Sequence, residues 1–165
     1  MIAEIAALNP GLRAIYILRN PVDRAWSSVV NTLARKRGRK IADVPLQELV
    51  DQARSVALSE RSDYASVIRR WRSVLGEDRL FVGYMEEIRS DPRELIDRIC
   101  SFLSIPPFPQ ELEADLYGRT NTTARHGAPM PDEVRTVLVQ DLMPFLEESA
   151  ALLGGYAERW LQEAR

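Results

Sequence analysis

The sequence predicts an α/β fold in which a parallel sheet is flanked by helices. Two short apolar runs, residues 13–18 and 79–84, have the length and composition of buried parallel strands. The first run is followed at once by Asn20 and Pro21, and this pair is typical of a helix start. Strand, tight turn and helix in this order form half of a βαβ unit, and most of the remaining chain has helical patterning.

The elements between the two runs follow from local signals. The first eight residues are predicted to end a helix, which the turn at residues 9–11 closes. The helix that begins at Asn20 runs to about Arg35. Two further helices are predicted for residues 45–58 and 62–75, and in the second one apolar residues recur at helical spacing until Gly76. The recurring residues are Tyr64, Val67, Ile68, Trp71 and Val74.

The last third of the chain is predicted to be helical apart from one polar loop. Asp91 and Pro92 begin a helix that runs to Leu103. A short helix follows the proline-rich stretch 105–109, then the loop 117–130, then one or two helices from Pro131 to the end. Only two strands are convincing, and two parallel strands alone do not make a stable sheet. We therefore expect either hidden strands or missing ones.

Composition indicates one globular domain over residues 1–165. Hydrophobic residues make up 45% and charged residues 28% of the chain, as in ordinary soluble proteins. No apolar run approaches the ~20 residues that a membrane span requires, so none is predicted. A single cysteine, Cys100, forms no internal disulfide and fits a cytoplasmic location. No histidine or cysteine cluster has metal-ligand spacing, so no metal is predicted.

The charge of −2 is unevenly distributed. Residues 1–40 hold eight Lys and Arg against two acidic residues, a net of +6, which leaves −8 for the remainder. A basic end on an acidic chain favours an anionic ligand near that end. The alternative is that residues 35–40 form a solvated basic loop. The acidic remainder and the lack of a recognisable reading module argue against nucleic acid as a partner.

The strand-to-helix turn carries the most chemical information. Arg19 ends the first apolar run, at the strand end where open α/β sheets bind ligands. Ser27 follows eight residues later, two turns into a helix whose start attracts anions. A guanidinium and a hydroxyl placed in this way can hold a phosphate monoester. The alternative is that Asn20 and Pro21 only begin a helix and that Arg19 pairs with Asp23.

With this spacing, the segment resembles the 3′-phosphate-binding motif of sulfotransferases that use 3′-phosphoadenosine 5′-phosphosulfate (PAPS). The resemblance continues in order through the rest of residues 5–160. It includes Ser62-Asp63-Tyr64, Trp71, Arg79-Leu80-Phe81-Val82, Glu86-Glu87, Ser90-Asp91-Pro92 and Ile99 to Leu103. It implies the P-loop NTPase-like sulfotransferase fold, with PAPS as co-substrate and Arg19 and Ser27 as cofactor-binding residues. The implied reaction is sulfuryl transfer to a hydroxyl or amine of a small-molecule or carbohydrate acceptor.

A second part of the cofactor site is implied by the loop before the C-terminal helices. Residues 121–131 are similar to the basic, glycine-containing loop that closes over the nucleotide in this family. Arg125 would then be a second 3′-phosphate ligand, and Gly127 would let the backbone come close. The alternative is a solvated loop. The only histidine, His126, is interpreted as a bystander, because no carboxylate is placed to orient it.

One part of the family pattern has no counterpart in this sequence. The family begins with a strand, a loop containing Gly and Lys, and a helix that hold the 5′-phosphosulfate. The two lysines here, Lys36 and Lys40, do not follow a glycine by three residues, and the usual catalytic base would also lie upstream. The chain therefore resembles the C-terminal two-thirds of a sulfotransferase, apparently without the first strand, loop and helix. We assign no catalytic residue and expect residues 15–18 to present an apolar edge.

Three hypotheses remain at this point. The first is a sulfotransferase chain that is complete only with upstream sequence. The second is a non-catalytic nucleotide-binding or partner-docking remnant of the fold. The third is a helical interaction domain in which the spacing of Arg19 and Ser27 is a coincidence. The sequence identifies neither the acceptor nor the oligomeric state.

Overall fold

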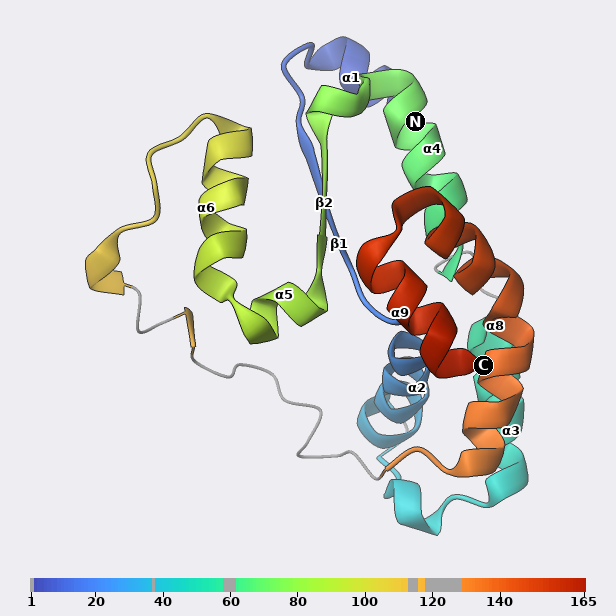
Figure 1. Cartoon of the computed structure of the whole chain (residues 1–165). Coiled ribbons are helices and arrows are strands. Elements are labelled where there is room, and N and C mark those ends of the chain that lie inside the picture. The colour runs from blue at the N-terminus through green and yellow to red at the C-terminus, as the bar shows by residue number, and fades with distance from the viewer. Residues whose placement is uncertain (1, 37, 58–61, 113–115, 118–128) are drawn as a thin grey trace. The chain divides into compact units, whose positions relative to one another are not determined.

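The structure of this chain is a computed structural model that describes residues 2–36, 38–57, 62–112, 116–117 and 129–165. The chain forms two compact units (Figure 1). The first consists of Met1–Arg19 and Ser66–Thr120, and the second of Asn20–Ala65 and Asn121–Arg165. Each unit therefore contains two separate stretches of the sequence.

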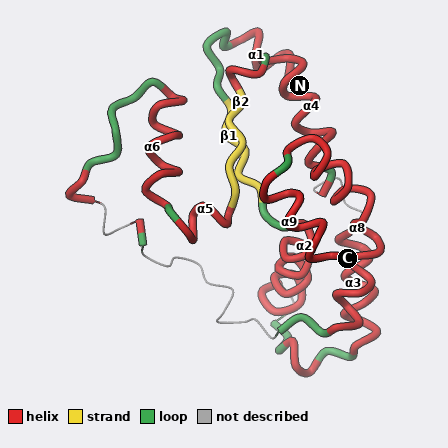
Figure 2. Tube along the Cα trace, viewed as in Figure 1, coloured by secondary structure: helices red, strands yellow, loops and turns green. Residues whose placement is uncertain are grey.

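The first unit is built around the predicted parallel sheet. Strand β1 (Ala14–Leu18) pairs in parallel with β2 (Leu80–Tyr84), with Ala14 opposite Leu80 and Leu18 opposite Tyr84. Figure 2 shows these two strands side by side in yellow. The helical elements of this unit are α1 (Ile2–Leu8), most of α4 (Tyr64–Leu75), η4 (Glu77–Arg79), α5 (Met85–Ser90), α6 (Pro92–Leu103) and η5 (Gln110–Leu112). The predicted α/β class and parallel pairing are confirmed for the described residues.

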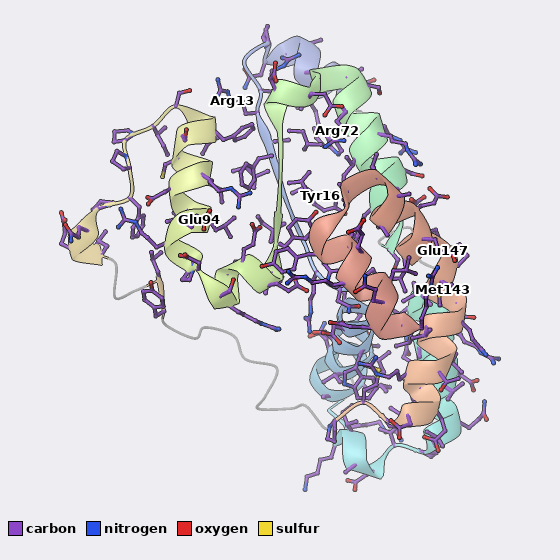
Figure 3. The ribbon with its side chains drawn as sticks, viewed as in Figure 1. Arg13, Tyr16, Arg72, Glu94, Met143 and Glu147 are labelled. Atoms are coloured by element: carbon purple, nitrogen blue, oxygen red, sulfur yellow. The ribbon has the colours of Figure 1, made fainter. Side chains whose placement is uncertain are left out.

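Helix α6 packs closely on one face of this sheet. The rings of Phe81 and Phe102 lie 5.5 Å apart. A Cβ at Gly83 would lie 2.9 Å from Cδ1 of Ile17 and 3.2 Å from Cδ1 of Leu95, so glycine here lets α6 approach β2. Arg13, labelled in Figure 3, places its guanidinium carbon 5.5 Å from the centre of the Phe102 ring.

The second unit is helical in the described residues. Its elements are α2 (Pro21–Val30), a π-helical continuation η1 (Asn31–Lys36), η2 (Ile41–Asp43), α3 (Leu46–Ala57), α8 (Asp132–Leu153) and α9 (Gly155–Ala164). Helices α2, α3 and α8 pack against one another, and α9 packs on α8. The helix predicted to reach about Arg35 does continue that far, but its last six residues have the wider π-helical hydrogen bonding.

The long helix α8 supplies the centre of this core. Its buried residues recur every four positions and form one stripe along the helix. They are Val134, Leu138, Leu142, Leu146 and Ala150. Pro144 lies inside the helix at an exposed position. The helix ends at Gly154, which has a φ of 64° that favours glycine, and α9 follows directly.

Two sequence-based expectations differ from the structure. No helix was predicted for the segment after β2, which is the short helix α5. The first strand was predicted from its composition to be buried, yet Ile15 is 41% exposed, as expected for an apolar edge, while Leu18 is buried. The reason is that α6 contacts β2 more than β1, so part of the face of β1 stays uncovered. None of the helices that the structure describes is long and apolar enough to span a membrane.

Candidate functional site

Arg19 directly follows β1 and ends the first of the two stretches that form the first unit. The pairing of Leu18 with Tyr84 brings both strands to an end at the same edge of the sheet. Ligands of open parallel sheets bind at this carboxyl edge. The structure therefore places Arg19 at the strand end predicted from the sequence, and its side chain is partly exposed.

Asn20 caps helix α2, as predicted. Its side-chain Oδ1 accepts a hydrogen bond from the backbone N–H of Val22 over 3.0 Å, and Pro21 is the first helical residue. The Asn20 side chain is buried, and its Nδ2 donates a hydrogen bond to Oε2 of Glu163 over 3.2 Å. Glu163 belongs to α9, so the C-terminal helix holds the residue that begins α2. No signal in the sequence connects these two residues.

Ser27 lies on α2, two turns from its start, and is half-buried. Arg24 lies three residues before it, so the two are neighbours on the helix surface. Arg24 donates from Nη2 to Oγ of Ser62 over 2.5 Å, and Ser62 is completely buried. The second unit thus brings together Arg24, Ser27 and Ser62, and of these only Ser27 was predicted from the sequence to bind a ligand.

The turn after β2 carries acidic side chains. The backbone N–H of Tyr84 donates to Oε2 of Glu87 over 2.7 Å, and Nη1 of Arg98 contacts Oε1 of the same carboxylate at 2.5 Å. Burial raises the pKa of the Tyr84 hydroxyl, and Glu87 and Glu86 raise it further. Arg72 and Arg98 lower it in part. Tyr84 is therefore neutral at physiological pH and can donate a hydrogen bond from its hydroxyl.

The second predicted part of the cofactor site, Arg125 and Gly127, lies outside the described residues, as does the neighbouring His126. Tyr64, one of the apolar residues that recur along its predicted helix, is buried and packs edge-on against Trp160 with ring centres 6.4 Å apart. Trp71, another of these residues, is only half-buried. Within the described ranges, no group of three or more His, Cys, Asp or Glu residues could hold a metal ion.

Comparison with known proteins shows which family the chain belongs to. The family model of the Sulfotransferase family matches residues 1–110, which is most of the chain, so the chain belongs to that family. The matched segment contains both strands, Arg19 and Ser27. Arg125 and Gly127 lie beyond it.

A solved structure supports the fold. The chain is similar to the crystal structure of a sulfotransferase from Alicyclobacillus acidocaldarius, with a TM-score of 0.67 and 21% sequence identity. The match covers 96% of this chain and 61% of that chain, so this chain spans about three-fifths of the length of that protein. The predicted sulfotransferase fold is thereby confirmed. None of the curated proteins matches this sequence.

Proposed function

We propose that this chain binds PAPS by its 3′-phosphate, through Arg19 and Ser27, as part of a sulfotransferase. The whole protein would transfer the sulfuryl group to a hydroxyl or amine of a small-molecule or carbohydrate acceptor, without a metal ion. The observation that carries the proposal is the start of α2. In a chain of this family, the cap of a helix directly follows an arginine at the carboxyl end of a parallel strand.

Each residue has a separate task in this proposal. The planar guanidinium of Arg19 donates two parallel hydrogen bonds to phosphate oxygens, which a lysine could not reproduce. The hydroxyl of Ser27 donates a further hydrogen bond from the helix. Arg125, with Gly127 allowing close approach of the backbone, is proposed as a second cationic ligand. These contacts orient the nucleotide but do not touch the sulfuryl group.

Orientation matters because sulfuryl transfer resembles phosphoryl transfer. The acceptor oxygen or nitrogen attacks sulfur and gives its proton to a base, the bond from sulfur to the bridging oxygen breaks, and negative charge develops on the leaving phosphate. A nucleotide held firmly by its 3′-phosphate presents the sulfuryl group in a fixed position. We assign no catalytic base among these residues. We place the reaction in the cytoplasm, where the buried free thiol of Cys100 needs no partner.

The proposal is tested by calorimetric titration of the chain with 3′-phosphoadenosine 5′-phosphate, with adenosine 5′-monophosphate as the control ligand. Hydrogen bonds to charged groups contribute about 1.5–3 kcal/mol, so Arg19→Ala should weaken binding of the bisphosphate about 10- to 100-fold. Ser27→Ala should weaken it about fivefold. The exposed Arg135 of α8 offers a matched control, and Arg135→Ala should bind as the unaltered chain does.

Two results would contradict the proposal. One is equal affinity of the folded chain for the two nucleotides, because the 3′-phosphate would then not be recognised. The other is undiminished binding by Arg19→Ala. Selective binding without transfer from PAPS to any of a panel of hydroxyl and amine acceptors would favour the alternative, a nucleotide-binding chain without catalysis.

A further inference from the structure

Arg24 is a partly buried cation whose charge is not balanced in the described structure. Its Nε atom is inaccessible to solvent and has no hydrogen-bond partner, and its one hydrogen bond goes to the neutral hydroxyl of Ser62. No described carboxylate lies within ion-pair distance of its guanidinium. A guanidinium has five N–H donors, and removing it from water without an anion is costly. The arrangement calls for an anionic acceptor that the residues described in the structure do not provide.

The position of Arg24 on α2 makes its uncompensated charge still less favourable. It is the fourth helical residue, and side chains on a helix lean toward its N-terminus. The guanidinium is thus directed to the end of α2 where the helix dipole is positive, which is an unfavourable place for a cation. The acidic residue next to it in the sequence does not compensate it, because Asp23 makes no ion pair with Arg24, and the carboxylate of Glu163 is hydrogen-bonded to Asn20.

We propose that Arg24 is a further phosphate-binding residue of this chain and that Ser62 is its positioning residue. The inference rests on the proposed function, since the anion is taken to be the 3′-phosphate of the nucleotide. Arg24 and Ser27 are three residues apart on one helix, with Cβ atoms about 5–6 Å apart, so guanidinium and hydroxyl can reach one group. Two N–H donors and one hydroxyl match the three terminal oxygens of a phosphate monoester better than the two of a carboxylate.

Ser62 makes this arrangement specific. Its hydroxyl is completely buried and accepts from Nη2, so it holds one side of the guanidinium in a fixed direction. The Nη1 group is left for the ligand. A serine in this role lowers the number of side-chain conformations that Arg24 must give up on binding, which increases affinity without contact between Ser62 and the ligand.

The test uses the full chain and titration with 3′-phosphoadenosine 5′-phosphate and adenosine 5′-monophosphate. Arg24→Gln keeps a donor for Ser62 but loses the charge, and we expect about tenfold weaker binding of the bisphosphate with unchanged binding of the monophosphate. Arg24→Lys keeps the charge without the planar fork and should lose about threefold. Ser62→Ala should lose about two- to threefold and should have no further effect in the Arg24→Gln background. Arg135→Gln is the matched control.

Inorganic phosphate provides a second measurement that does not depend on the nucleotide. Phosphate should raise the melting temperature of the chain, and Arg24→Gln should remove most of that rise. If the chain fails to bind the bisphosphate, the proposed function fails and with it the nucleotide as the ligand, while phosphate stabilisation that requires Arg24 still upholds Arg24 as a phosphate-binding residue. Wild-type affinity in Arg24→Gln combined with loss in Arg19→Ala overturns it, as does a folded chain that phosphate does not stabilise. Should Arg24→Gln not fold, undiminished binding by Arg24→Lys overturns it equally.

Discussion

The two units of this chain differ in how completely they bury their apolar side chains. In the second unit, α2, α3, α8 and α9 enclose a core in which Leu138, Leu142 and Leu146 have no exposed surface. In the first unit, Ile5, Leu8, Ile15 and Ile88 are all exposed. Among the described residues, Leu46 is the only large exposed apolar side chain of the second unit.

The comparison indicates where a precise binding site can be built. Helix α2 belongs to the unit with the closed core, so Asn20, Arg24 and Ser27 are carried by a well-supported element. A binding residue on such a support keeps its position better than one on a loop. The two-stranded sheet of the first unit has less cover, and it relies in part on Arg13 and Arg98 lying over the rings of Phe102 and Phe81.

The largest expected effect comes from opening the core of the second unit. Leu142→Ala removes a side chain with no exposed surface and should lower the free energy of unfolding by about 2–5 kcal/mol, through lost burial and the cavity left behind. Ile15→Ala in the first unit should cost about 1 kcal/mol or less, because the side chain is already 41% exposed. Urea denaturation followed by far-ultraviolet circular dichroism measures both.

A matched leucine keeps this prediction from resting on residue type alone. Leu46 begins α3 in the same unit and is 43% exposed, so Leu46→Ala should cost no more than Ile15→Ala. If all three substitutions lowered the free energy of unfolding equally, the difference in apolar burial between the two units would not affect stability. A larger loss from Ile15→Ala than from Leu142→Ala would mean that the first unit contributes more to stability than the second.

A smaller effect is expected at the start of α2. Asn20→Ala removes the cap and should cost about 1 kcal/mol, within the usual range for such caps. Glu163→Ala should cost less, because the Oδ1 bond to Val22 remains. Glu163→Gln still offers an oxygen acceptor to Asn20 and should be close to the unaltered chain. Thermal unfolding gives the stabilities, and amide hydrogen exchange at Val22 reports the cap directly.

The two residues should also be coupled. In a double-mutant cycle, the cost of Glu163→Ala should largely disappear in the Asn20→Ala background, since the acceptor has then lost its donor. If the losses in stability from the two single substitutions were additive, Glu163 would stabilise the chain through a contact other than the one to Asn20. A gain in stability from Glu163→Gln would point instead to unfavourable charge on the glutamate.

The elements that were predictable from sequence are those with local signals. Asp91 and Pro92 begin α6 as expected, with Oδ1 of Asp91 accepting from the backbone N–H of Glu94 over 2.9 Å. Helix α5 was missed because the residue before it is Tyr84, which is no typical cap, although Glu87 closes the turn from within the helix. Short-range chemistry reveals a helix start only when the capping residue is of the common type.

For the candidate site, the limit of prediction was set by distance along the chain. Arg19 and Ser27 could be predicted as binding residues because eight positions separate them within one strand–turn–helix motif. The bond from Asn20 to Glu163 joins residues 143 positions apart, and that from Arg24 to Ser62 joins residues 38 apart. Such contacts arise from the packing of helices and leave no periodic trace. The binding roles of Arg19 and Ser27, like those of Arg125 and Gly127, remain predictions.

The smallest expected effect lies in the first unit and appears only in alkali. Burial, followed by the charges of Glu87 and Glu86, raises the pKa of Tyr84, so the folded chain holds this proton more tightly than the unfolded chain does. Below pH about 10, both states are protonated at this hydroxyl and stability does not depend on it. As pH rises past that value, the unfolded chain loses the proton first, and the free energy of unfolding falls until the folded chain has lost it too.

Tyr84→Phe should therefore flatten the decline in stability above about pH 10, measured by urea denaturation at each pH. Tyr117 is 60% exposed in the same unit, and Tyr117→Phe should leave the decline unchanged. An identical decline in all three chains would mean that burial and the two glutamates do not hold the proton on Tyr84. A decline removed by Tyr84→Phe would show that the first unit, although it leaves apolar side chains exposed, shields the turn at the end of β2 from water. That turn would then be the part of the first unit most similar to the closed core of the second.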